Sequence, residues 1–150
     1  VGHPRQRTGA AACVLQGRLY LVGGFSSDFG ALQSVISISK EGRQQGEWRK
    51  EGSMTCRREG VAACAYEDSL GFGSVVALGG SNGTGILATA EKATSTLHED
   101  GKDSELNHFI DLPDMPIKRA NATAAALRVN AREANVFAIG GFSDGGLVTN

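Results

Sequence analysis

The feature that most constrains this chain is a pair of sequence blocks that occurs three times in the same order. The first block starts at an arginine and continues through small residues, and the second is a short apolar run that ends in two adjacent glycines. The arginines are Arg7, Arg58 and Arg119, which are 51 and 61 residues apart. A repeat of this length indicates an architecture in which each copy is one structural unit packed on the next.

A third block, located before the arginine, agrees with this alignment. Met54 and Met115 each precede an arginine by four residues, and His3 takes that place in the first copy. Trp48 and Phe109 each precede their methionine by six residues. The distance from the arginine to the first glycine of the pair is 16, 21 and 21 residues in the three copies. We attribute the longer spacing to a longer hairpin loop in the second and third copies.

Each copy predicts a small antiparallel sheet. The small residues after the arginine suit an inner strand, where sheets converge on a channel. The continuous apolar run before the glycine pair predicts a strand that is buried on both faces. Residues 34–39 alternate apolar side chains with serines and predict a half-exposed third strand. Residues 48–52 and 109–112 predict outer strands whose aromatic side chain fills the gap between sheets.

A glycine pair that closes an apolar strand, an aromatic residue further on and a period near 50 residues together resemble the Kelch motif. The resemblance covers essentially the whole chain and implies an all-β fold of four-stranded antiparallel β-propeller blades. We expect residues 1–150 to form a single Kelch propeller fragment, an incomplete ring with repeats at 7–57, 58–118 and 119–150, the last one truncated. The remaining blades would come from the same chain or from self-assembly, because propeller closure protects strand edges.

One segment fits a different family. Residues 75–90 resemble the GxxxGxG fingerprint of NAD(P)-binding short-chain dehydrogenases, in which a strand leads through a glycine turn into a helix. The same strand and glycine pair recur in the other two copies without the remaining glycines, whereas a dinucleotide site needs one such turn. The Tyr-x-x-x-Lys motif of that family is also absent. We therefore keep this interpretation only as a remote alternative.

Composition narrows the function further. The net charge is −1 with interspersed signs, and neither a basic stripe for nucleic acid nor an apolar run long enough for a membrane span occurs. Cys13, Cys56 and Cys64 lack the spacing of a disulfide framework or a zinc site, and we expect them to be small buried residues. The histidines His3, His98 and His108 are scattered, and the carboxylates within 99–105 belong to a polar loop. We expect no catalytic centre, metal or cofactor, and a cytoplasmic location.

The loops at one end of the blades are the candidate binding site. In a propeller, the loops before the inner strands and the loops after the glycine pairs open at the same end. In the Kelch substrate adaptors that this chain resembles, the arginine before the inner strand and the polar residue after the glycine pair contact peptide ligands. The matching positions are Arg7, Ser26, Arg58, Asn82, Arg119 and Ser143. A ring of guanidinium groups would favour an acidic segment of a partner protein. Alternatively, the arginines bond neighbouring-blade carbonyls and only brace the ring.

We therefore expect a protein-interaction module, such as the substrate-recognition part of a ubiquitin-ligase adaptor or a scaffold. A second possibility implied by the resemblance is an enzyme or sugar-binding protein similar to sialic-acid mutarotases or galactose oxidase. Because propellers host both binders and enzymes, the fold does not separate these two functions by itself.

Overall fold

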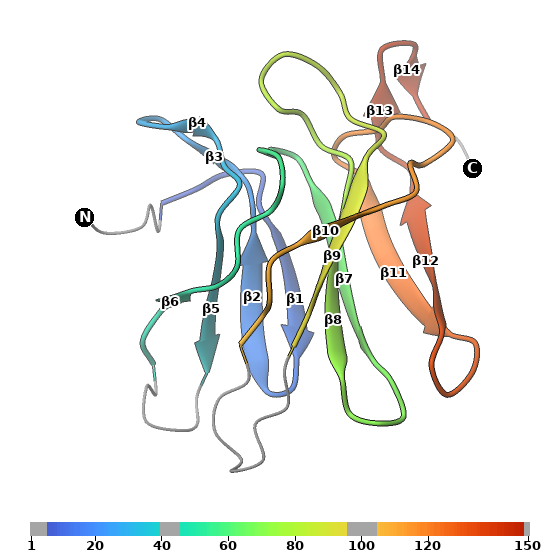
Figure 1. Cartoon of the computed structure of the whole chain (residues 1–150). Coiled ribbons are helices and arrows are strands. Elements are labelled where there is room, and N and C mark those ends of the chain that lie inside the picture. Colours follow the sequence, from blue (N-terminus) through green and yellow to red (C-terminus); the bar gives the residue numbers. More distant parts are fainter. Residues whose placement is uncertain (1–5, 40–45, 96–104, 149–150) are drawn as a thin grey trace.

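The chain folds into sheets of antiparallel strands that stand side by side (Figure 1). The computed structural model describes residues 6–39, 46–95 and 105–148, and these residues are all β without a helix. His3, His98 and three of the loop carboxylates, Glu99, Asp100 and Asp103, lie outside the described residues. The expected all-β fold of four-stranded blades is confirmed, and the described residues do not close a ring.

Two complete blades and half of a third make up the fold. Blade 1 has the order β1-β2-β5-β6, blade 2 has the equivalent order β7-β8-β9-β10, and the half-blade consists of β11 and β12. The strands of blade 1 are β1 (Ala11–Leu15), β2 (Arg18–Val22), β5 (Val35–Ser39) and β6 (Arg49–Lys50). Those of blade 2 are β7 (Ala62–Glu67), β8 (Gly73–Leu78), β9 (Ala90–Thr94) and β10 (Ile110–Leu112). The half-blade strands are β11 (Thr123–Arg128) and β12 (Ala134–Ile139).

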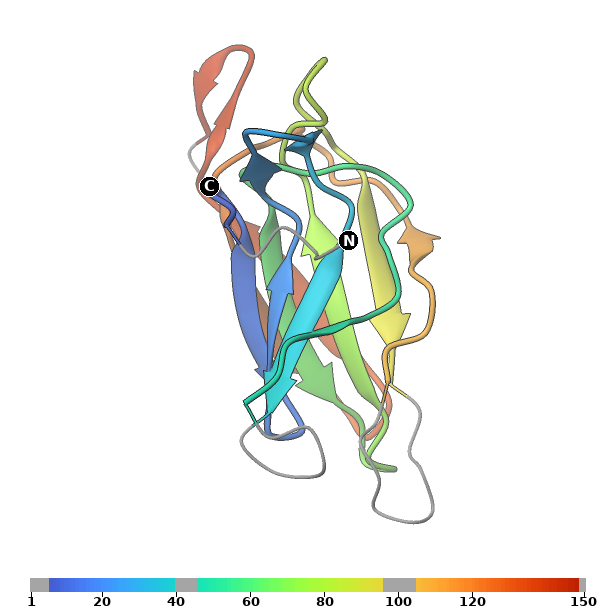
Figure 2. The same ribbon diagram turned by 90° about the vertical axis from the view of Figure 1, so that its left-hand side faces the viewer.

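Two small hairpins stand on the blades at one end of the molecule, which we call the mouth end. Their strands are β3 (Phe25–Ser26) with β4 (Gly30–Ala31), and β13 (Phe142–Ser143) with β14 (Gly146–Leu147). Figure 2 shows both hairpins projecting beyond the long strands at this same end. The turns that join β1 to β2, β7 to β8 and β11 to β12 lie at the opposite end (Figure 1).

Apolar side chains fill the gaps between the blades. Tyr20 and Val22 of blade 1 pack with Val75 and Ala77 of blade 2, and the aromatic ring of Phe109 belongs to the same cluster. A second cluster joins the other face of blade 2 to the half-blade. Phe109 is 4% exposed, as the sequence predicts for an aromatic between sheets, whereas Trp48 is only half-buried.

Burial of the apolar strands depends on their neighbours. All six residues of β8 are buried, because blade 2 has a sheet on each side. The equivalent strands β2 and β12 each have exposed residues, since each terminal sheet has only one described neighbour. The predicted burial on both faces is therefore confirmed for the middle blade only.

The expectation of a half-exposed third strand in blade 1 is wrong. Ser37 and Ser39 of β5 are buried together with the apolar residues of that strand. The Ser37 hydroxyl accepts hydrogen bonds from Arg18 and donates one to the Glu51 carboxylate over 2.5 Å. A buried polar network therefore takes the place of solvent around these serines.

The alternative dinucleotide-binding segment does not fold as that site requires. After β8 and the glycine pair, the chain passes through a loop into β9, which pairs antiparallel with β8. A dinucleotide fingerprint needs a helix at this position, with its N-terminus directed at the pyrophosphate. The glycines instead permit close packing: Gly23 has a φ of +60°, and a Cβ there would lie 2.5 Å from the backbone oxygen of Arg58.

Candidate functional site

The three repeated arginines are directed into the blades. Arg58 is 1% exposed, and its Nη1 donates to the carbonyl oxygens of Gly79 at 2.8 Å and Thr89 at 3.0 Å. Its Nη2 donates to the Thr89 hydroxyl at 2.9 Å, and its Nε donates to the Glu91 carboxylate at 2.8 Å. The Glu91 side chain is fully buried, so this is a buried ion pair. A charge reversal at Arg58 would place two carboxylates together in the blade and test its stability instead of a partner contact.

Arg7 and Arg119 repeat this geometry. Arg7 Nη1 donates to Gly23 O at 2.9 Å, and Arg119 Nη1 donates to Gly140 O at 2.9 Å. Each arginine thus binds the carbonyl of the first glycine in its own blade, and partial burial lowers the pKa of Arg7. The geometry supports the bracing alternative, with the correction that the carbonyls belong to the arginine's own blade. Contact of these guanidinium groups with a partner stays a prediction.

The backbones of Arg58 and Arg119 are each bonded to the preceding blade. Gly24 N donates to Arg58 O at 2.7 Å, and Arg58 N donates to Leu32 O at 2.9 Å. Gly80 N donates to Arg119 O at 2.9 Å in the next copy. One residue therefore connects two blades, with its side chain in one and its main chain against the other.

The polar residues after the glycine pairs order their own loops. Ser26 is 5% exposed, and its hydroxyl accepts a hydrogen bond from Asp28 N. Asn82 Oδ1 accepts hydrogen bonds from the backbone amides of Thr84 and Gly85, both at 3.0 Å. Ser143 is half-buried in β13. Their predicted contact with a partner is not tested by these bonds and stays a prediction.

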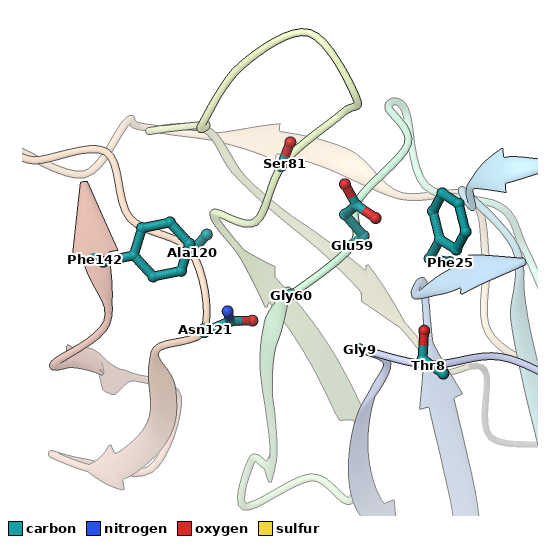
Figure 3. A pocket seen from close by; sticks show the side chains of 9 residues that line it. All are labelled: Thr8, Gly9, Phe25, Glu59, Gly60, Ser81, Ala120, Asn121 and Phe142. Carbon is teal, nitrogen blue, oxygen red and sulfur yellow. The ribbon is translucent and has the colours of Figure 1, made fainter. Parts of the chain in front are cut away.

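A pocket of about 220 Å³ opens at the mouth end, and we call it the mouth pocket (Figure 3). Three equivalent positions in each of the three sheets line it: the first and second residues after the arginine, and the first residue after the glycine pair. The lining residues are Thr8, Gly9, Phe25, Glu59, Gly60, Ser81, Ala120, Asn121 and Phe142. Equivalent residues of the three repeats therefore meet at one concave surface.

Backbone hydrogen bonds hold the mouth pocket in place. Gly60 N donates to Gly9 O, and Asn121 N donates to Gly60 O, both over 2.8 Å. These three residues have φ values of +59°, +58° and +52°, so the second position adopts the left-handed conformation in every sheet. Glu59 and Ser81 also exchange two backbone hydrogen bonds of 2.8 Å. Such a lattice of main-chain bonds fixes the direction of each lining side chain.

The lining differs in chemistry from the predicted guanidinium ring. Phe25 and Phe142 are 41% and 40% exposed, and Glu59 supplies a carboxylate that forms no ion pair within the described part of the chain. None of the lining residues is a lysine, arginine or histidine. The arginine points into its blade, whereas the residue after it forms an isolated β-bridge with the residue after the glycine pair, and both of these line the mouth. That one-residue shift is the signal that could have identified Glu59 from the sequence.

A second cavity lies between blade 1 and the segment that precedes β10. It is lined by residues 50–52 and 105–108. The Glu51 carboxylate beside it accepts hydrogen bonds from Ser37, from Arg49 Nε at 2.6 Å and from Leu106 N at 3.0 Å. The bond from Leu106 N joins the segment before β10 to blade 1, and the three bonds together occupy the buried Glu51 carboxylate. Across the residues that the structure describes, no three His, Cys, Asp or Glu side chains are grouped to hold a metal ion.

The sheets of antiparallel strands pack face to face, and loops at the same end of each sheet line a common mouth. This arrangement defines the β-propeller class. The family model described as "Kelch motif" matches residues 6–55, which include all strands of blade 1. Residues 6–55 thus match a Kelch motif, and the four-stranded antiparallel sheets are consistent with Kelch-type β-propeller blades. A comparison with curated proteins found no match. Within the described residues, no helix is long and apolar enough to cross a membrane.

Proposed function

We propose that this chain is a protein-interaction module that presents its mouth end to a partner protein or peptide. The observation that carries the proposal is the convergence of nine residues, three from each sheet, on the mouth pocket. A surface assembled from loops on a rigid scaffold is a frequent place for binding residues. The substrate-recognition part of a ubiquitin-ligase adaptor, or a scaffold, would use such a surface, and a cytoplasmic location fits the three free cysteines.

Exposed apolar side chains at the mouth end support a protein partner. Phe25, Phe29 and Phe142 are 41%, 54% and 40% exposed, and Leu147 is 87% exposed. All four lie on or between the strands of the two small hairpins. Large exposed apolar groups that gather on one surface are typical of interaction sites, and aromatic anchors often dominate the binding energy.

The expectation of an acidic partner segment depended on guanidinium groups that face the mouth end. Because Arg58 and Arg119 are buried in their blades, the positive charge of the pair is not available at that surface. The proposal therefore keeps a protein or peptide as partner and leaves an acidic segment out. It also includes no catalytic step, and no observation in the described residues favours the mutarotase-like or oxidase-like alternative.

Site-specific photocrosslinking tests the proposal. A photoreactive benzoylphenylalanine at Ser81, within the mouth pocket, is expected to crosslink a partner in an extract of the source cells. The same residue at Arg132, an exposed position in the turn between β11 and β12, is expected to crosslink much less.

Matched phenylalanine variants decide whether the captured partner uses the mouth. Phe142→Ala should reduce the crosslinked product several-fold, because Phe142 lines the pocket. Phe72→Ala removes a ring that is 42% exposed at the opposite end and should leave the product unchanged. Crosslinking that is stronger from Arg132, or equal loss in both variants, would contradict the proposal.

A further inference from the structure

The mouth pocket contains one formal charge, and that charge is negative. Glu59 is the only ionisable residue among the nine that line the pocket. Its backbone amide and carbonyl are both bonded to Ser81, so its position is fixed by main-chain bonds. Its carboxylate has no hydrogen-bond partner or ion pair within the described residues, although Glu91 and Glu51 in the blades are both paired.

The cations nearest to this carboxylate in sequence are already engaged. Arg58 is bonded to Glu91 and to two carbonyls of its own blade. Arg57 Nη1 donates to Phe29 O at 3.1 Å, and Lys118 forms an ion pair with Asp144. The ion pairs formed within the described part of the chain therefore do not include Glu59.

Two aromatic rings stand on opposite sides of this carboxylate. Figure 3 shows Phe25 on one side and Phe142 on the other, with Glu59 and Gly60 between them. The rings belong to blade 1 and the half-blade, and each is about two-fifths exposed. The face of an aromatic ring attracts a cation, and arginine is the side chain most often found in such contacts.

The remaining polar groups can each accept a hydrogen bond from an N–H donor, although the Ser81 hydroxyl already accepts one from Gly83 N at 3.2 Å. Thr8 and Ser81 contribute hydroxyls, and Asn121 contributes an amide oxygen that lies against Gly60. A guanidinium group has five N–H donors in one plane and no acceptor, whereas an ammonium group is a compact, strongly hydrated point charge. The volume of about 220 Å³ is below the roughly 300–1,000 Å³ of sites for drug-sized ligands and suits a single side chain.

We infer that the mouth pocket binds an arginine side chain of a partner segment, with the guanidinium paired to Glu59 and flanked by Phe25 and Phe142. This inference rests on the proposed function, since it names the chemistry of the partner. It reverses the charge of the partner expected from the sequence.

An NMR titration of the isotopically labelled 150-residue chain tests the inference with four small probes. These are the N-acetyl methylamides of arginine, lysine, glutamate and citrulline, the last of which keeps the shape of arginine without its charge. The arginine probe is expected to shift the amide signals of Gly9, Gly60 and Asn121 in a saturable manner. The citrulline probe should bind at least about fivefold more weakly, because it lacks the charge that pairs with Glu59.

Two glutamate variants provide the matched comparison. Glu59→Gln should weaken arginine binding about fivefold, whereas Glu67→Gln removes an exposed carboxylate at the far end of β7 and should have no effect. Saturable shifts with the glutamate probe, equal binding of arginine and citrulline, equal binding of arginine and lysine, or an unchanged Glu59→Gln would each overturn the inference. If Ser81 nevertheless crosslinks a partner, the inference fails while the proposed function stands.

Discussion

The repeated arginine connects two blades because its main chain and side chain are bonded in different directions. Its guanidinium binds the first glycine carbonyl of its own blade, and its backbone binds the glycine pair and loop of the blade before. In blade 2 the buried partner Glu91 adds a charge pair, and removal of one member of such a pair leaves an uncompensated buried charge. The recurrence of arginine at this position therefore has a structural cause that needs no ligand.

Tyr20 is the residue whose burial is least compensated by hydrogen bonds. Its side chain is fully buried, and its hydroxyl finds no partner among the described residues. Burial, and secondarily the nearby Glu51 carboxylate, raises the pKa of Tyr20 from 10.0 to about 12. The hydroxyl has lost its water without gaining a hydrogen bond.

We predict that Tyr20→Phe raises the free energy of unfolding by about 1 kcal/mol, because it removes an unsatisfied buried group. Urea denaturation at pH 7 measures this change. Tyr66→Phe, at the half-buried tyrosine of β7, is the control and should alter stability by less than about 0.5 kcal/mol. A Tyr20→Phe variant that is less stable than the parent would contradict the prediction.

Tyr20→Phe should also change how the free energy of unfolding depends on pH. Between pH 10 and about 12 the unfolded chain loses the Tyr20 proton while the folded state keeps it, so stability falls as pH rises. The Cys13 and Cys64 thiols act in the same direction from about pH 9, since burial raises their pKa values to about 12 and about 11. Tyr20→Phe should make the fall above pH 10 shallower, and an unchanged slope would mean that the hydroxyl is not desolvated.

At the scale of elements, the glycine pairs allow each blade to pack closely against the next one. The first glycine of the pair contacts the following blade in the first two copies: a Cβ on Gly23 would meet Arg58 O, and one on Gly79 would meet Arg119 O. Gly140 occupies the same position, and a Cβ there would have no neighbour within 4 Å among the described residues. Gly140 therefore requires glycine only for its backbone conformation, whereas Gly23 and Gly79 also require it for close packing against the next blade.

Alanine substitution should expose that difference. Gly140→Ala should cost about 1 kcal/mol, because its φ of +67° is unfavourable for a residue with a side chain. Gly23→Ala should cost at least about 2 kcal/mol, since it adds the overlap with Arg58 O to the same backbone strain. Urea denaturation of the two variants measures the difference, and equal costs would show that Arg58 moves aside freely.

The strand pattern was largely predictable from the sequence, and the direction of individual side chains was not. The repeat located the inner, second, third and outer strands because the apolar runs and glycine pairs recur in the same order in each copy. It did not reveal that Ser37 is buried, since that depends on Arg18 of β2 and on Glu51, which follows β6. Likewise, the sequence placed the repeated arginines at the mouth, whereas the structure directs their side chains into the blades and lines the mouth pocket with the residues that follow them. Periodicity states that neighbours alternate and does not state which of them faces the channel.

For the whole molecule, the two terminal sheets have open apolar faces that correspond to the two sides of one interface. Val14 and Leu19 of blade 1 are 67% and 38% exposed and occupy the places of Ala65 and Val75 in blade 2. On the half-blade, the exposed residues are Leu127 at 64%, Phe137 at 46% and Ile139 at 48%. Contact between unlike faces of this kind joins copies head to tail.

We therefore predict that the 150-residue chain associates in a concentration-dependent manner through these faces. Phe137→Lys and Val14→Lys should each lower the weight-average mass in sedimentation equilibrium, because a charge would be buried at the contact. Leu70→Lys, which changes a residue 60% exposed in the turn between β7 and β8, is the control. Equal masses for the parent and the two face variants would refute the prediction.

The turns opposite the mouth end differ in length among the three sheets. The β1–β2 turn consists of Gln16 and Gly17, whereas residues 68–72 and 129–133 form the turns of the next two sheets. At the mouth end, the backbones of Arg58 and Arg119 are each bonded to the glycine pair of the preceding blade, and their side chains to the first glycine of their own blade. An affinity tag or an inserted domain would thus be accommodated at 130–132 and would disrupt the fold at 56–60. Added length at these turns leaves the bonds of the arginines intact, whereas an insertion beside Arg58 would separate its backbone from Gly24 and Leu32.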